Sequence, residues 1–251
     1  MASSLLVLTF GAIGASCLSA VSGMGGGIIL FALLNIFYPP PVALALHALA
    51  QIASNGTRIA VFLRYVKWHL LVPYAIGSTV GIGLASAVFL SLPEQLMQMV
   101  IALFLASYAL FNQQVARLPV IAVARHNLSF LPIGLLAGLL SMTLGAVGPV
   151  LSPFIKENIA HKESFIATKA LLQIWVQCCK SVVLLTVFAF SVGDYAVELG
   201  LMIAALLSGT LLGKHWLKHI NELWFDKLLR AALLLVAISM LLEATAGQTF
   251  I

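Results

Sequence analysis

Charged residues are scarce in this sequence, and their scarcity decides the class of protein. Only 8% of the 251 residues are Asp, Glu, Lys or Arg, whereas roughly 25% are charged in an average soluble domain. The chain is instead 62% hydrophobic, with a mean hydropathy of +1.09. Its apolar runs are continuous rather than alternating, which favours membrane-spanning helices over the strands of a barrel. The sequence therefore predicts an all-α integral membrane protein in a lipid bilayer.

Lys and Arg are missing altogether from the first 57 positions. A cleaved signal peptide begins with a basic segment, so we expect none here. The net charge of +5 is spread over short loops, where basic residues act as a topology signal. No nucleic-acid partner is expected, because binding one would need a basic cluster.

Residues that hold metals or cofactors are also few. Cys17, Cys178 and Cys179 offer no disulfide framework, and we expect the adjacent pair to be buried small residues rather than metal ligands. His215 and His219 have the i, i+4 spacing of metal ligands, but their basic surroundings favour a solvated face. The chain has no H-E-x-x-H motif, no intramembrane carboxylate pair and no ATP-binding loop. We therefore expect no enzyme activity, metal, cofactor or ATP-driven motor.

Glycine, in contrast, is concentrated at one early position. Gly23, Gly25, Gly26 and Gly27 fall within five residues, and each glycine costs about 1 kcal/mol relative to alanine inside a helix. The helix should break here and restart near Ile28. Exposed backbone at this depth is tolerated only inside protein or beside a cavity, and the N–H groups of a helix start suit an anion. The alternative is that these glycines only allow close helix packing.

A weaker copy of this pattern lies near the middle of the chain. Gly145 and Gly148 precede Pro149, which stands where proline favours the first position of a helix. A shift of 122 positions aligns eight identical residues over about forty positions, a duplication typical of transporters. The aligned pairs are Ser19 with Ser141, Gly23 with Gly145, Gly26 with Gly148, Ala45 with Ala167, Ala48 with Ala170, Leu49 with Leu171, Gln51 with Gln173 and Ile52 with Ile174.

The apolar segments accordingly form two repeats. The first repeat, residues 1–112, should hold a broken helix at 5–20 and 28–37 and spans at 42–65, 70–90 and 95–111. Residues 113–129 form a polar link. The second repeat, residues 130–251, should hold a broken helix at 130–143 and 149–155 and spans at 164–190, 199–212 and 228–242.

Two topologies fit these spans. If each broken helix crossed the membrane once, the repeats would be parallel and the basic loops would face both sides. If each broken helix is a hairpin that enters and returns, the repeats are inverted and the basic loops share one side, opposite Glu94, Asp194 and Glu198. Basic residues prefer the cytoplasm, so we expect two inverted repeats, each a broken, re-entrant-like hairpin plus three transmembrane helices. Both termini should then lie outside.

Two polar stripes follow the broken helices. His47, Gln51, Asn55 and Arg58 have spacings that place them on one helix face. Lys169, Gln173, Gln177 and Lys180 repeat that spacing at the same offset. Intramembrane charges usually face a bundle interior or a water path. The stripes predict an anion path with the breaks at its centre and one cation, Arg58 or Lys180, toward each mouth; the alternative is that the two cations snorkel to lipid headgroups.

These residues resemble the sulfite exporter TauE/SafE family over essentially the whole chain. The resemblance lies in Gly23-Met24-Gly25-Gly26-Gly27, in Gln51, in the run from Lys162 to Gln173 and in the pair Gly209 and Gly213. It implies a bacterial inner-membrane permease that moves sulfite, sulfonates or related sulfur oxyanions, typically outward. The second hairpin departs from this pattern, because Gly145-Ala146-Val147-Gly148-Pro149 is poorer in glycine.

We therefore predict a secondary transporter, an exporter of a small sulfur-containing oxyanion that works by alternating access. The expected substrate-binding residues are Gly25, Gly26, Gly27, Gln51, Asn55, Arg58, Gly145, Gly148, Gln173, Gln177 and Lys180, with His47 and Lys169 along the pathway. A passive anion channel would use the same cations. A permease for an unrelated small anion is the other alternative.

Overall fold

The computed structural model describes residues 2–22, 25–89, 91–115, 129–145, 147–159, 161–216 and 222–246. About 90% of the described residues are helical, and none of them lies in a strand. This confirms the all-helical prediction. The α-helices are α1 (Ala2–Ser22), α2 (Gly26–Phe37), α3 (Pro40–Val61), α4 (Leu71–Phe89), α5 (Glu94–Val115), α6 (Phe130–Leu144), α7 (Gly148–Asn158), α8 (Lys162–Thr186), α9 (Ala196–Trp216) and α10 (Glu222–Ala246).

Within the described residues, four segments are long and apolar enough to cross a membrane, namely Trp68–Phe89, Glu94–Phe111, Lys162–Thr186 and Gly193–Leu212. Such lengths suit a hydrocarbon core of about 30 Å, since a helix rises about 1.5 Å per residue. By the same measure α2, with 12 residues, and α7, with 11, are too short to cross. The chain is a multi-pass membrane protein whose first and sixth helices each precede a short one.

The described helices group into two compact units. Unit 1 comprises Met1–His47, Leu92–Asn112 and Ser191–Ile251, and unit 2 comprises Ala48–Ser91 and Gln113–Phe190. Each unit therefore takes segments from both predicted repeats. The division of the sequence into two repeats stays a prediction. Gly23, Met24 and most of the predicted link at 113–129 lie outside the described residues.

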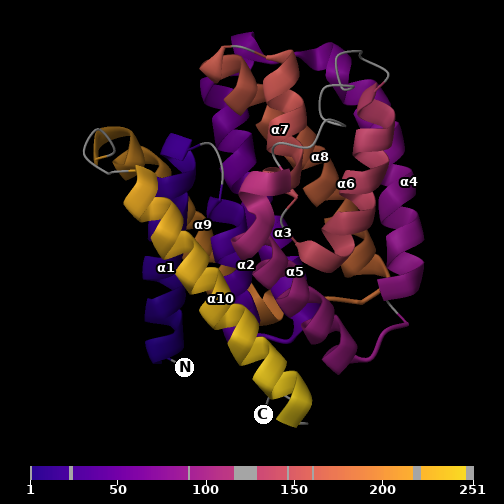
Figure 1. The fold of residues 1–251 in the computed structure, drawn as a ribbon, viewed down its shortest axis with the longest axis vertical. Helices are drawn as coiled ribbons and strands as arrows, with labels where there is room; N and C mark the ends of the chain where they lie inside the picture. The colour runs from indigo at the N-terminus through magenta and orange to yellow at the C-terminus, as the bar shows by residue number, and fades with distance from the viewer. Residues whose placement is uncertain are drawn as a thin grey trace. The chain divides into compact units, whose positions relative to one another are not determined.

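In unit 2, α4 packs along α6 through glycines on both helices (Figure 1). A methyl group on Gly77 would collide with the Leu131 carbonyl oxygen, and one on Gly81 with that of Leu135. Residue numbers rise together on the two helices, so α4 and α6 run parallel. Gly77 and Gly81 therefore have a packing role, because small residues let helix backbones approach closely in membranes.

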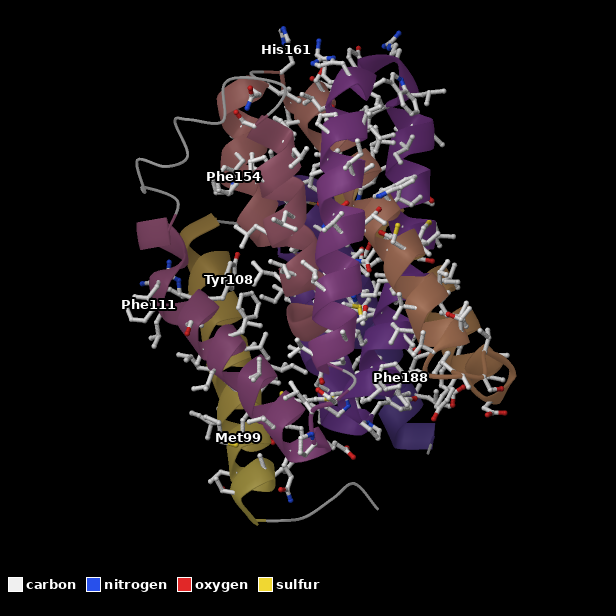
Figure 2. All side chains as sticks on the ribbon, turned by 90° about the vertical axis from the view of Figure 1, so that its right-hand side faces the viewer. Met99, Tyr108, Phe111, Phe154, His161 and Phe188 are labelled. Atoms are coloured by element: carbon white, nitrogen blue, oxygen red, sulfur yellow. The ribbon has the colours of Figure 1, made fainter. Side chains whose placement is uncertain are left out.

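The loop between α3 and α4 contacts α8 near one end of unit 2. The backbone N–H of Lys67, in the loop between α3 and α4, donates to Thr168 Oγ1 in α8 at 3.1 Å. Figure 2 shows His161, just before α8, and Phe188, just after it, at opposite ends of this unit. We call the end near His161 the basic end of unit 2, because it carries the exposed residues Arg64, Lys67, Lys156 and Lys162.

In unit 1, α1 packs against α9 and α2. A methyl group on Gly209 of α9 would collide with the Ile13 carbonyl oxygen. Methyl groups on Gly11 of α1 and Gly26 of α2 would meet Leu33 and Ala15, respectively. Residue numbers therefore run in opposite directions along α1 and α2, so the chain reverses between them and forms a hairpin.

Candidate functional site

The second break, between α6 and α7, forms a hairpin inside unit 2. Helix α6 ends at Leu144, and Gly145 follows in a positive-φ conformation (φ 63°) that favours glycine. Helix α7 then runs antiparallel to α8, since its start at Gly148 lies by Gln173 while Lys156 lies by Phe165. Because α6 is parallel to α4, α6 and α7 enter and return at the basic end of unit 2.

The polar stripe of α8 lies against this break. Of its side chains, Lys169 is 4% exposed, Gln177 2% and Lys180 0%. A methyl group on Gly148 would approach Gln173 Nε2 at 2.6 Å and Lys169 Cε at 3.4 Å. An amide and the aliphatic end of a lysine thus lie against the N-terminus of α7. Gln173 is 11 residues into α8, about 16 Å at 1.5 Å per residue, so the break lies near the middle of that helix.

Lys180 binds the break itself. Its Nζ donates a hydrogen bond of 3.0 Å to the backbone carbonyl of Gly145, between α6 and α7. This differs from the expected location toward one mouth of a path. The reason is the length of the lysine side chain, which reaches a carbonyl that α6 leaves without an intrahelical donor. The shift of 122 positions that aligns the two polar stripes does not predict this contact.

The final turns of α3 also approach α8 in unit 2. Arg58 Nη1 donates to Asn55 Oδ1 at 3.3 Å, and the Arg58 and Lys169 charges interact electrostatically. A methyl group on Gly56 would lie 3.8 Å from Ile174 Cδ1. Lower numbers on α3 therefore face higher numbers on α8, so the two stripes run antiparallel. Gln51 is 5% exposed on the same helix.

Several buried polar atoms near these helices have no hydrogen-bond partner within the described residues. They include Asn55 Nδ2 on α3 and Gln177 Oε1 on α8, which occupy equivalent positions in the two stripes. The hydroxyls of Ser54 and Ser181 share this property. A buried polar atom without a partner costs about 1 to 3 kcal/mol. These groups are therefore available to bind a polar ligand or water.

The first break is built differently. Gly25 has φ 90° and precedes α2, so the predicted bend is present and requires glycine there. Gly26, however, is packed against α1, because a methyl group on it would collide with the Ala15 carbonyl oxygen. His47 Nε2 lies 3.0 Å from the Gly27 carbonyl oxygen, and its ring contacts Phe31 edge-on. Gly26 thus has a packing role that the sequence alone could not separate from anion binding.

The cysteines and histidines considered as metal ligands in the sequence can be located in the structure. The described residues contain no group of three or more His, Cys, Asp or Glu that could hold a metal ion. The expectation that Cys178 is buried is wrong, because it is exposed on α8. The Cys179 Sγ lies 3.8 Å from Thr79 Oγ1. His219 and the side chain of His215 lie outside the described part.

Comparison with known protein families gives a match over most of the chain. The family model described as sulfite exporter TauE/SafE matches residues 8–240. No curated protein and no solved structure matches the chain. The match covers both breaks and both polar stripes.

Proposed function

Because this chain belongs to the sulfite exporter TauE/SafE family, whose members are membrane transporters of sulfur anions, we propose that it is a secondary transporter that exports a small sulfur oxyanion. Sulfite and organosulfonates are the candidate substrates, and the bacterial inner membrane is the location. One observation carries the proposal: Gln173 and Lys169 lie against the N-terminus of α7 inside a helical break.

The chemistry of this break suits an oxyanion. The first N–H groups of α7 lack intrahelical partners, and the helix dipole places partial positive charge there. The Gln173 amide can donate to a second oxygen. Buried Lys169, when protonated, adds positive charge in surroundings where charge interactions are stronger than in water. Together these groups can replace part of the water shell that an anion loses on entering the membrane.

The topology we propose is a pair of inverted repeats. In unit 2, the α6–α7 hairpin opens at the basic end, near Lys67 and Lys156. In unit 1, the α1–α2 hairpin ends at Tyr38, whose ring contacts Tyr195 at 5.8 Å. Burial, followed by the nearby Glu198 carboxylate, raises the pKa of Tyr38. Glu198 and Asp194, which directly precedes Tyr195, make this end of unit 1 acidic.

The positive-inside preference then assigns the two hairpin openings to different sides. The basic end of unit 2 lies in the cytoplasm, and the acidic end of unit 1 lies outside, together with both chain termini. The first turn of α1 and the last turn of α10 lie toward the same end of unit 1 (Figure 1), which supports placing both termini on one side. Inverted repeats of this kind permit alternating access around a central site.

Within this scheme the predicted residues have separate tasks. Gly145 and Gly148 shape the second break, and Gly25, Gly26 and Gly27 shape the first. Polar contacts to the substrate come from Gln51, Asn55, Arg58, Gln173, Gln177 and Lys180, while His47 and Lys169 line the pathway. The unpartnered Asn55 Nδ2 and Gln177 Oε1 support direct contact with a polar substrate.

The test is anion flux into liposomes that contain only the purified protein. Sulfite, sulfate, thiosulfate, an organosulfonate and chloride are compared, with and without a proton gradient. We expect sulfite or the sulfonate to move fastest, and unlabelled substrate on the far side to accelerate exchange of labelled substrate. Exchange that unlabelled substrate leaves unchanged would favour a channel, and flux of chloride alone would favour an unrelated anion permease.

A further inference from the structure

A single buried ring at the basic end of unit 2 contacts two lysines. The Nζ of Lys156, on α7, lies 5.9 Å from the Phe165 ring centroid, and that of Lys169, on α8, lies 5.7 Å from it. Both distances are within the range of cation–π attraction. Lys156 is exposed, whereas Lys169 is 4% exposed. The ring therefore connects a cation at the surface with one inside the helical bundle.

Positive charge accumulates around this ring. Lys169 interacts electrostatically with both Lys156 and Arg58, which come from different helices. Like charges at short range repel, and the repulsion grows where water is excluded. An anion placed among these three cations would be attracted to each of them and would offset their mutual repulsion. A divalent oxyanion gains more from such a site than a halide, because its charge is larger and its several oxygens can each accept a hydrogen bond.

A neutral donor nearby also suggests a ligand. Asn55 is fully buried, and its Oδ1 accepts a hydrogen bond from Arg58. That bond identifies Nδ2 as the remaining donor, and Nδ2 has no partner within the described residues. The donor belongs to the helix turn that also carries Arg58, so it can serve an anion held near Lys169.

We propose that Lys156, Phe165 and Lys169 form a vestibule site that captures the sulfur oxyanion from the cytoplasm before it reaches the break at Gly148. The site rests on the proposed function and adds Lys156 and Phe165 to it. Lys169 belongs to both positions, because its Cε also approaches Gly148. An anion can therefore pass from the vestibule site to the break without leaving this lysine.

The experiment measures labelled sulfite uptake into membrane vesicles of both orientations, from cells that lack their own sulfite exporter. Inverted vesicles present the cytoplasmic face to the substrate, and right-side-out vesicles present the outer face. Lys156→Met should raise KM by about two- to fivefold in inverted vesicles, as expected for one partly screened charge. KM in right-side-out vesicles and the maximal rate should not change.

Three comparisons make this result specific. The increase in KM should shrink at high salt, because salt screens an exposed charge, and Lys156→Arg should restore the wild-type value. Phe165→Leu should shift KM in the same direction, since it removes the ring and keeps an apolar side chain. Lys162→Met is the control, because Lys162 is exposed in the neighbouring turn and should leave KM near wild type.

Other outcomes would overturn the vestibule site. An unchanged KM in Lys156→Met would fit a lysine bound only to lipid headgroups. A KM that rises equally in both vesicle types, or only in right-side-out vesicles, would contradict a site on the cytoplasmic face. An equal rise of KM in Lys162→Met would show that the effect is not specific to Lys156. Absence of wild-type transport of every sulfur oxyanion tested would instead refute the proposed function. The two failures are therefore distinguishable.

Discussion

The Lys180 ammonium donates a hydrogen bond of 3.0 Å to the carbonyl oxygen of Gly145, 35 residues earlier in the chain. Lys180 is fully buried, so this bond joins the C-terminal part of α8 to the break in the α6–α7 hairpin. A residue that we expected to serve only the anion therefore also supports the shape of the site.

This contact changes what a neutral replacement of Lys180 should do. Lys180→Met removes the donor to a buried carbonyl, which should lower the free energy of unfolding by about 1 to 3 kcal/mol. Sulfite flux should fall as well. The melting temperature of the purified protein in detergent, read beside its flux, separates the two effects. Lys162→Met, at an exposed position, should change neither the melting temperature nor the flux. Loss of flux in Lys180→Met at an unchanged melting temperature would show that the bond to Gly145 is unimportant for stability.

The pairing of α4 with α6 predicts a second effect on stability. A methyl group on Gly134 would collide with the Tyr74 carbonyl oxygen, and overpacking of this kind costs about 1 to 3 kcal/mol. Gly134→Ala should therefore lower the melting temperature. Gly83→Ala is the matched control, because a methyl group at Gly83 of α4 meets nothing within 4 Å. Equal melting temperatures for the two variants would contradict the packing of these helices.

Arg58 should act through its guanidinium. Arg58→Gln should strongly reduce sulfite flux, and Arg58→Lys should fall between it and wild type, because only arginine binds two oxygens at once. Arg64→Gln is the control, since Arg64 is exposed beside the Tyr65 ring. Initial rates at equal expression provide the measurement. Wild-type flux in Arg58→Gln would mean that Arg58 only snorkels to lipid headgroups.

Much of the fold could be predicted because glycine and charge are unevenly distributed. The helix breaks at Gly25 and Gly145 are where the glycines made a continuous helix costly. Boundaries were less accurate, because α8 ends at Thr186 whereas the sequence predicted a span to Phe190. Apolar side chains continue past that point, and their hydrophobicity gives no stop signal.

Two features of the site could not be predicted, for physical reasons. A glycine that packs against a helix and a glycine beside an anion look identical in the sequence. Gly26 and Gly148 could therefore be distinguished only by their neighbours in the structure. The sequence also does not show whether an apolar side chain faces the protein interior or lipid, because lipid is as apolar as a protein interior. This is why Cys178, expected to be buried, is exposed instead.

The hairpin topology can be tested with single cysteines in a background without native cysteines. His69 and His161 are exposed near the basic end of unit 2, and Ser191 is exposed in unit 1. We expect an impermeant maleimide to label His69→Cys and His161→Cys from the cytoplasm only, and Ser191→Cys from outside only. A broken helix that crossed the membrane once would place His69 and His161 on opposite sides. Labelling of these two cysteines from different faces would therefore refute the hairpin in unit 2.

Substitutions at the two breaks should differ in their effects on stability and on sulfite binding. Gly26→Ala should lower the melting temperature and leave sulfite affinity nearly unchanged, because its methyl group would collide with the Ala15 carbonyl oxygen. Gly148→Ala should remain folded, since the atom its methyl group meets at 2.6 Å is the Gln173 side-chain nitrogen, which can move. Moving that amide should weaken binding, and a misplacement of about 1 Å can cost on the order of a hundredfold in a well-tuned site.

Both variants are compared by melting with and without sulfite. Gly148→Ala should lose most of the stabilisation that sulfite gives the wild type, whereas Gly26→Ala should keep it at a lower starting temperature. Gly14→Ala in α1 is the control, because a methyl group at Gly14 meets nothing within 4 Å. Full sulfite stabilisation in Gly148→Ala would exclude the N-terminus of α7 as the binding position, because the displaced Gln173 amide could then have no contact with the substrate.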